Sequence, residues 1–354
     1  MTTESTARPL PFLRGVRIVV ALELAQRVRG VSSFVLLALF FLLTGAVTGL
    51  LVVATGVLGG SGAIVGGWIY SVLVYFVLLL GCLVTPALSG TAVNGERDAG
   101  TLATTQVTLV TTAQLVLGKF ASAWLVTLAF LVSTVPFLLV GVAVGGVSPV
   151  SGFVSVLVLA VQLGVVAAIG VGLSGILDRP LMSVVTTYLV IAALSVGSLI
   201  AFGLLTAVTS STERTVYVGE QSAQGLYCDD YEATVPRPDY YWGLLAVNPF
   251  VVLADAVPPA LGPYGQPNDL FSSISVAVRQ AQIPPDLEIE IDCATGSRVG
   301  EYPVSTPQQV FERTVPSWFV GLALQLVLAV GLLFGAIRRT ATPASRLPRG
   351  RRVA

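Results

Sequence analysis

The sequence lacks histidine altogether and has a single lysine, Lys119, among its 19 basic residues. Histidine is the most common general base and metal ligand, so its absence excludes a histidine-based catalytic triad or metal site. A phosphate-binding loop of the G-x-x-x-x-G-K-[ST] type is also missing, because Phe120 follows Gly118-Lys119 and no glycine stands five positions before Gly118. We therefore expect the chain to be no enzyme, to use no cofactor, and to bind no ATP by that route.

Charge is scarce as well. Only 11% of the 354 residues are charged and 54% are hydrophobic, whereas a soluble domain carries about 25% charged residues. So little polar surface cannot coat a water-soluble particle, and lipid must be the solvent for much of the chain. The formal net charge of zero points to no nucleic-acid partner. Abundant alanine, valine and glycine, with arginine in place of lysine, is typical of a GC-rich bacterial genome, as in actinobacteria.

The sequence does contain long apolar runs without a single charged residue. About 20 residues at 1.5 Å each cross a hydrocarbon core of roughly 30 Å. The sequence therefore predicts an all-α integral membrane protein with six transmembrane helices. They cover residues 31–54, 66–89, 120–144, 152–177, 181–207 and 316–337.

Arginine distribution predicts the orientation of these helices. With six spans both termini share one side, and that side holds 14 of the 19 basic residues and only five of the 19 acids. We expect a multi-pass protein of the cell membrane with both termini in the cytoplasm. The ends would then be a cytoplasmic amphipathic segment (1–30), with a helix over 13–29 in the headgroup region, and a basic tail (338–354). A plain cytoplasmic flank is the alternative reading of 1–30.

Segment 208–315, between the fifth and sixth spans, is polar and rich in proline and is expected to be extracytoplasmic. It contains Cys228 and Cys293, which an oxidising compartment would join in a disulfide; two free thiols are the alternative. Cys82, in the second span, is expected to be a small packing residue.

The spans offer no ionisable group for a proton relay, which argues against coupling to an ion gradient. Hydroxyl side chains in the second and fifth spans predict a mildly polar path, better suited to an amphipathic or lipid-like substrate than to a hydrated ion. They are Thr85, Ser183, Thr186, Thr187, Ser195 and Ser198.

The loop over 90–119, between the second and third spans, is long for a simple connection. Asp98 is placed to cap a short helix over about 99–107, and Thr111 or Thr112 to cap the third span, with Lys119 near the membrane surface. Such a helix beneath the bilayer is suited to being pushed by another protein. A surface loop without a function is the alternative.

The residues of this loop resemble a known family. Glu96-Arg97-x-x-Gly100-Thr101-Leu102, followed by Leu117-Gly118-Lys119, is similar to the segment after the second span in permeases of the ATP-binding-cassette (ABC) type-2 exporter class. Asn248-Pro249-Phe250 resembles a further stretch of that family. Ala103 and Leu109 depart from its usual acidic and turn residues.

The resemblance implies a permease subunit that works with two copies of a separate ABC ATPase, as a homodimer or paired with a sister permease in membrane lipid. Residues 97–110 would form the coupling helix in a groove of the ATPase. Glu96 and Arg97 would anchor that contact, Gly100 would let the backbones approach, and Lys119 would hold the helix at the interface. Thr101 and Leu102 would belong to the same ATPase-coupling set. The alternatives are a gradient-driven transporter or channel, and a non-transporting membrane scaffold whose outer segment binds a ligand or partner.

Overall fold

The computed structural model describes residues 11–57, 63–98, 110–144, 146–218, 229–295, 297–300 and 306–341. These residues divide into two compact units, described separately here. The first unit comprises Met1–Ala193 and Ala323–Ala354, and the second comprises Leu194–Leu322.

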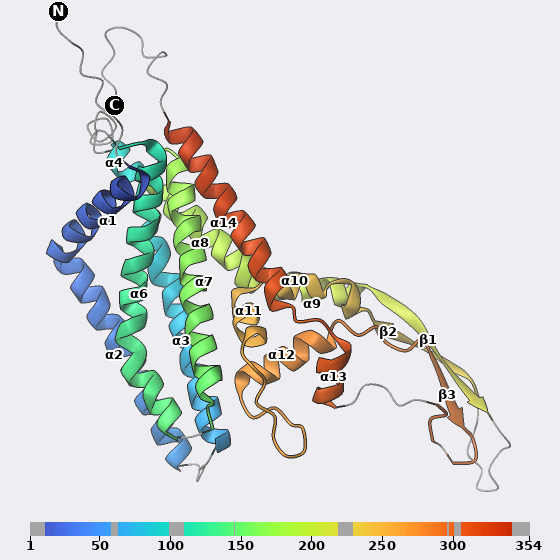
Figure 1. Cartoon of the computed structure of the whole chain (residues 1–354). Helices are drawn as coiled ribbons and strands as arrows, with labels where there is room; N and C mark the ends of the chain where they lie inside the picture. The colour runs from blue at the N-terminus through green and yellow to red at the C-terminus, as the bar shows by residue number, and fades with distance from the viewer. Residues whose placement is uncertain are drawn as a thin grey trace, which may run out of the picture. The chain divides into compact units, whose positions relative to one another are not determined.

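Where the structure describes the first unit, its regular elements are helices (Figure 1). They are α1 (Phe12–Arg29), α2 (Val31–Val57), α3 (Ala63–Ser89), the short α4 (Asn94–Asp98), α6 (Thr112–Val144), α7 (Pro149–Ile176), α8 (Pro180–Ala192) and the larger part of α14 (Trp318–Thr340).

The six predicted spans are confirmed as helices that are long and apolar enough to cross a membrane. They are Ser33–Val57, Val65–Asp98, Thr112–Val144, Pro149–Ile176, Pro180–Val208 and Trp318–Thr340. The third begins at Thr112 instead of residue 120, so that Lys119 lies inside a helix. The uncharged run marks only the part of a helix that lipid surrounds, and the helix itself continues into the headgroup region.

Helices α3 and α7 form the core of the first unit. In the most apolar stretch of α7, 72% of the residues are buried, against 17% in the first span. Side chains such as Leu73, Leu159 and Ile169 are completely enclosed. A Cβ atom at Gly175 of α7 would lie 2.4 Å from the Cβ atom of Ala336 of α14, so glycine is needed for the close contact between these two helices.

Several of the hydroxyl groups predicted to line a substrate path are enclosed within this single chain. Thr85, Ser183 and Thr187 are completely buried. The hydroxyl of Thr187 donates to the carbonyl oxygen of Ser183 at 2.7 Å, as is common for Thr inside helices. Their contribution to a path for substrate stays a prediction.

The second unit combines short helices with a three-stranded sheet. The helical elements are a π-helical turn (Ala193–Gly197), α9 (Ser198–Val208), a 3-10 turn (Pro238–Tyr240), α10 (Trp242–Ala246), α11 (Pro249–Ala256), α12 (Leu270–Gln280), α13 (Pro307–Arg313) and the start of α14. The strands are β1 (Ser210–Val218), β2 (Tyr231–Pro236) and β3 (Glu288–Asp292).

The sheet has the order β2-β1-β3. Strand β1 pairs antiparallel with β2, with Ser210 opposite Pro236, and parallel with β3, with Arg214 opposite Glu288. The all-α prediction therefore describes the spans, and the segment between the fifth and sixth spans adds a sheet to them.

Asp255 organises the helices of the second unit. One carboxylate oxygen accepts hydrogen bonds from Ser275 and Arg279, both at 2.6 Å, and the other accepts from the backbone and hydroxyl of Ser317 and the backbone of Trp318. Asp255 thereby joins α11, α12 and the start of α14. Burial raises the pKa of this carboxyl, but the bonds from Ser275 and Arg279, the charge of Arg279 and the bond from Ser317 together bring it below its ordinary value.

The Asn248-Pro249-Phe250 stretch begins α11. Asn248 accepts a hydrogen bond from the backbone of Phe250 at 2.9 Å and so caps the helix, while its amide donates to Ser195 and Ser198. Because of these contacts, the compact unit starts at Leu194 and is wider than the predicted segment 208–315.

Cys293 follows β3 and is disulfide-bonded. Its predicted partner, Cys228, lies outside the described residues, so the pairing stays a prediction. Cys82 is a free, buried thiol in the second span, where it packs as expected.

Candidate functional site

The candidate site lies in the first unit, at the end where α1 and α4 meet the start of α6 (Figure 1). At its centre is Lys119, whose side chain is only 1% exposed. Its ammonium group lies 2.6 Å from a carboxylate oxygen of Glu96 in α4 and also binds the carboxylate of Glu23 in α1. We call Glu23, Glu96 and Lys119 the ionic cluster. A buried ammonium group is tolerated only when it is paired in this way.

Helix α1 brings Glu23 to the cluster through one face. Gly15, Val19 and Glu23 are its buried residues, and their spacing of four places them on the same side of the helix. A Cβ atom at Gly118 of α6 would lie 2.6 Å from the Cβ atom of Val19. Glycine at 118 therefore lets α1 approach α6 closely, and Lys119 beside it pairs with the acid that this approach delivers.

Helix α4 is fixed in place by Asn94. The hydroxyl of Ser174 in α7 donates to the side-chain oxygen of Asn94 at 3.0 Å and accepts from the backbone N–H groups of Val93 and Asn94. The amide of Asn94 donates to the carbonyl oxygen of Leu177. Glu96 thus projects from a segment that is anchored on the end of α7.

A second group of charges lies on the surface of the same end. The carboxylate of Asp178, between α7 and α8, binds Arg97 at 3.0 Å and Arg339 of α14 at 3.2 Å. The side chain of Asp178 is 67% exposed, so water screens these pairs and each contributes little stability. The pairs nevertheless show that the ends of α4, α7 and α14 lie together.

The predicted cap of the third span is confirmed at Thr111. Its hydroxyl accepts from the backbone of Gln114 at 3.3 Å, and the side chain of Gln114 accepts from the backbone of Thr111 at 2.8 Å. This reciprocal pair is a capping box at the start of α6. It fixes where α6 begins, two turns before Lys119.

Of the predicted coupling residues, the structure brings Glu96 and Lys119 together and places Arg97 beside Asp178. Gly100, Thr101 and Leu102 lie outside the described residues, as does most of the predicted coupling helix over 97–110. Asp98 is the last residue of α4, so its predicted role as a cap for a following helix also falls outside the description.

Sequence reasoning did not identify Glu23, Asn94 and Ser174 as parts of the site. A signal for Glu23 existed, because it is the only acid between residues 5 and 95 and Lys119 is the only lysine. Asn94 and Ser174 carry no such signal, since asparagine and serine are common at helix ends.

The chemistry of the site is ionic. It offers one cation between two carboxylates and no nucleophile beside a base. Within the part of the chain that the structure describes, no group of three His, Cys, Asp or Glu side chains is arranged to hold a metal ion. Comparison of the sequence with protein-family models and with curated proteins gives no match.

Proposed function

We propose that the chain is the membrane-spanning permease subunit of an ABC exporter of the type-2 class, and that a separate ATPase subunit supplies its energy. The observation that carries the proposal is the ionic cluster. Lys119 of the third span is bound to Glu96 on one side and to Glu23 of α1 on the other.

We infer that residues 99–111, between α4 and α6, receive the force that the ATPase applies. Glu96 lies in α4, two residues before that helix ends, and Lys119 lies two turns inside α6, so one ion pair links the two helices that flank residues 99–111. A force applied to this segment reaches α6 through Lys119, α7 through Asn94 and α1 through Glu23. An ATPase that pushes on this segment would therefore move three helices together.

The geometry also refines the roles that the resemblance implies for single residues. The carboxylate of Glu96 is bound to Lys119 inside the unit, so we propose that Glu96 and Lys119 transmit force. Arg97 is about as exposed as Glu96, with 23% against 26% of the side chain accessible, but it is held by a pair that water screens, so its guanidinium is freer to turn toward the ATPase. We propose that the exporter moves an amphipathic or lipid-like substrate, because its membrane spans are only weakly polar.

Co-purification tests the proposal. The tagged chain, extracted from its native membrane in mild detergent, should carry an ATPase subunit with a Walker-type sequence and should hydrolyse ATP. Arg97→Ala should reduce ATP hydrolysis while leaving the fold intact, and Arg214→Ala in the second unit, where the arginine is 58% exposed, serves as the control. A chain that purifies without any ATPase, or full activity in Arg97→Ala together with Glu96→Ala, would contradict it.

The second candidate is a non-transporting scaffold with a ligand-binding outer part. The second unit favours it, because this unit has its own buried network around Asp255 and a disulfide at Cys293. A protein of this kind would lack the ATPase and would bind its partner through the second unit alone.

A further inference from the structure

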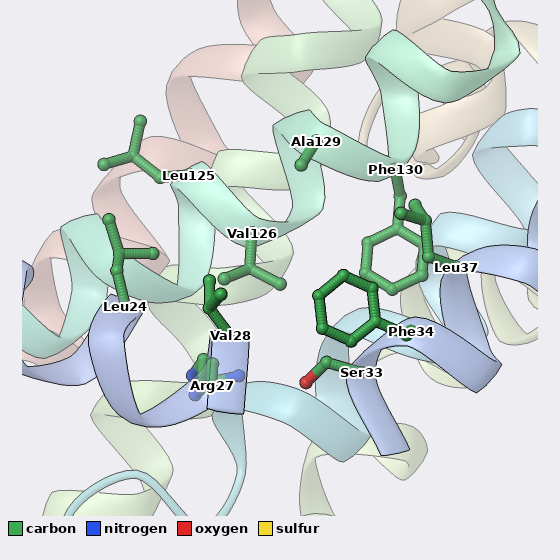
Figure 2. A pocket seen from close by; sticks show the side chains of 10 residues that line it. All are labelled: Leu24, Arg27, Val28, Ser33, Phe34, Leu37, Leu125, Val126, Ala129 and Phe130. Atoms are coloured by element: carbon green, nitrogen blue, oxygen red, sulfur yellow. The ribbon is translucent and has the colours of Figure 1, made fainter. Parts of the chain in front are cut away.

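A cavity lies between α1, α2 and α6 in the first unit. Its volume is about 340 Å³, within the range of sites that hold small molecules. Most of its walls are apolar: Leu24 and Val28 come from α1, Phe34 and Leu37 from α2, and Val126 and Phe130 from α6. Figure 2 shows these side chains around the same space.

The cavity lies at one end of a membrane-spanning segment. Ser33 and Phe34, in its wall, are the first residues of the first span. The residues of α1 that line it come just before that span. In a bilayer this is the depth at which acyl chains give way to headgroups. The cavity is open on one side, where Val28 is 62% exposed and Phe34 is 55% exposed. Water does not fill so apolar an opening favourably, whereas a neighbouring lipid chain does.

Arg27 adds a charge at the headgroup end of the cavity. It is the one charged residue among those that line it. One terminal nitrogen of its guanidinium donates to the carbonyl oxygen of Leu88 at 2.8 Å, which holds the side chain in place. A guanidinium has five N–H donors and matches the geometry of a phosphate. Glu23, one turn earlier on α1, is bound to Lys119.

We propose that this cavity is a binding site for an anionic phospholipid of the surrounding bilayer. One acyl chain would lie along Phe34, Val126 and Phe130, and the phosphate would accept hydrogen bonds from Arg27. The bound lipid would fill the space between α1 and α6 and so contribute to their packing. This inference rests on the six membrane-spanning helices and does not depend on the proposed transport function.

The test uses the full-length protein after removal of lipid in detergent. Native mass spectrometry would measure the binding of phosphatidylglycerol and of phosphatidylcholine with the same acyl chains. Arg27→Gln should weaken phosphatidylglycerol binding by about tenfold to a hundredfold, the range expected for one charge-assisted hydrogen bond. Phosphatidylcholine binding should weaken less, because this lipid carries the same phosphate but no net negative charge. Arg29→Gln is the matched control, because Arg29 is exposed on the same helix and does not line the cavity.

A variant that fills the cavity provides a second, independent test. Ala129→Phe places a ring in the cavity and should weaken the binding of both lipids. Val132→Phe is its control, since Val132 lies on the same helix, is 66% exposed and is not part of the cavity wall. Unchanged binding in Ala129→Phe, or an unchanged preference for phosphatidylglycerol in Arg27→Gln, would overturn the proposal. The proposal would also be overturned if Ala129→Phe converted a dimer of the protein to monomers while lipid binding stayed the same.

A measurement on the unmodified protein gives a result that does not depend on whether the variants fold. Phosphatidylglycerol with a photoactivatable group in its acyl chain would be cross-linked to the protein in liposomes, and the labelled peptides identified. Labels should concentrate on residues 24–37 and 125–130. Labels spread evenly over all the exposed helices would show ordinary lipid contact and refute a defined site.

Discussion

The ammonium group of Lys119 lies 2.6 Å from the carboxylate of Glu96, although 22 residues separate the two in the chain. Between them lies the segment that resembles the coupling helix of ABC type-2 permeases. The same ammonium group also binds Glu23, from the N-terminal helix. Three elements therefore meet at one buried charge, and this arrangement leads to the first prediction.

Removal of the charge at Lys119 should destabilise the first unit. Lys119→Met leaves two carboxylates facing each other with no cation between them, and breaking a buried pair in this way costs about 3–5 kcal/mol. Thermal unfolding in detergent measures the loss. Adding Glu23→Gln and Glu96→Gln to Lys119→Met should recover most of it, because no unpaired charge then remains. Equal stability of the single and triple variants would show that the cluster is not the cause.

Gly118 should tolerate no side chain. Gly118→Ala places a Cβ atom 2.6 Å from that of Val19 and forces α1 away from α6. Overpacking of this kind costs about 1–3 kcal/mol. Gly49→Ala in α2 is the control, since nothing lies within 4 Å of its added Cβ atom and alanine favours a helix. Limited proteolysis at the start of the chain should be faster in Gly118→Ala and unchanged in Gly49→Ala.

Asp255 should make the second unit sensitive to acid. Its pKa lies below the ordinary 3.8, so its ionised form stabilises the fold at every pH above that value. This contribution is lost as the pH falls below 3.8 and through the pKa of the folded state. Tryptophan fluorescence during acid titration should show a transition there in the wild type. Asp255→Asn should be less stable at neutral pH and should lack this acid-dependent step.

The control for Asp255 is Asp286→Asn. Asp286 is half exposed and pairs with Arg298 at the surface, so the variant should unfold in acid as the wild type does. An acid transition that is the same in Asp255→Asn and in the wild type would assign the step to another carboxyl group.

Labelling with a membrane-impermeant thiol reagent tests the orientation. In a Cys82→Ser background, Asp98→Cys should react only after the membrane is permeabilised, whereas Tyr264→Cys should react in intact cells. Tyr264 is 94% exposed in the second unit, so its label reports the side of the membrane on which that unit lies. The background chain should not react on either side if Cys228 and Cys293 are joined. The reverse pattern of labelling would remove the basis for a cytoplasmic coupling segment.

Short alternating patterns in the second unit illustrate what sequence reasoning overlooked. Glu288-Ile289-Glu290-Ile291-Asp292 has the two-residue period of a strand and forms β3. The pairing of β3 with β1 joins residues more than 70 positions apart, and no local pattern contains that information.

The amino-acid sequence was sufficient to predict a membrane protein with six helices that are long and apolar enough to span a bilayer. An uncharged run of more than 18 residues has few alternatives to a membrane-spanning helix, because every side chain around such a helix is compatible with lipid. The sequence also limited the cap of the third span to Thr111 or Thr112, since capping is a local contact. The structure selects Thr111.

The partners of the charged residues depend on how the helices pack in the folded chain. Glu23 and Lys119 are 96 positions apart, and they meet because Gly118 admits Val19 and so sets the distance between α1 and α6. The same packing creates the cavity beside Arg27. Both depend on the fit of side chains from different helices, and that fit is a property of the folded chain that hydropathy along the sequence does not contain.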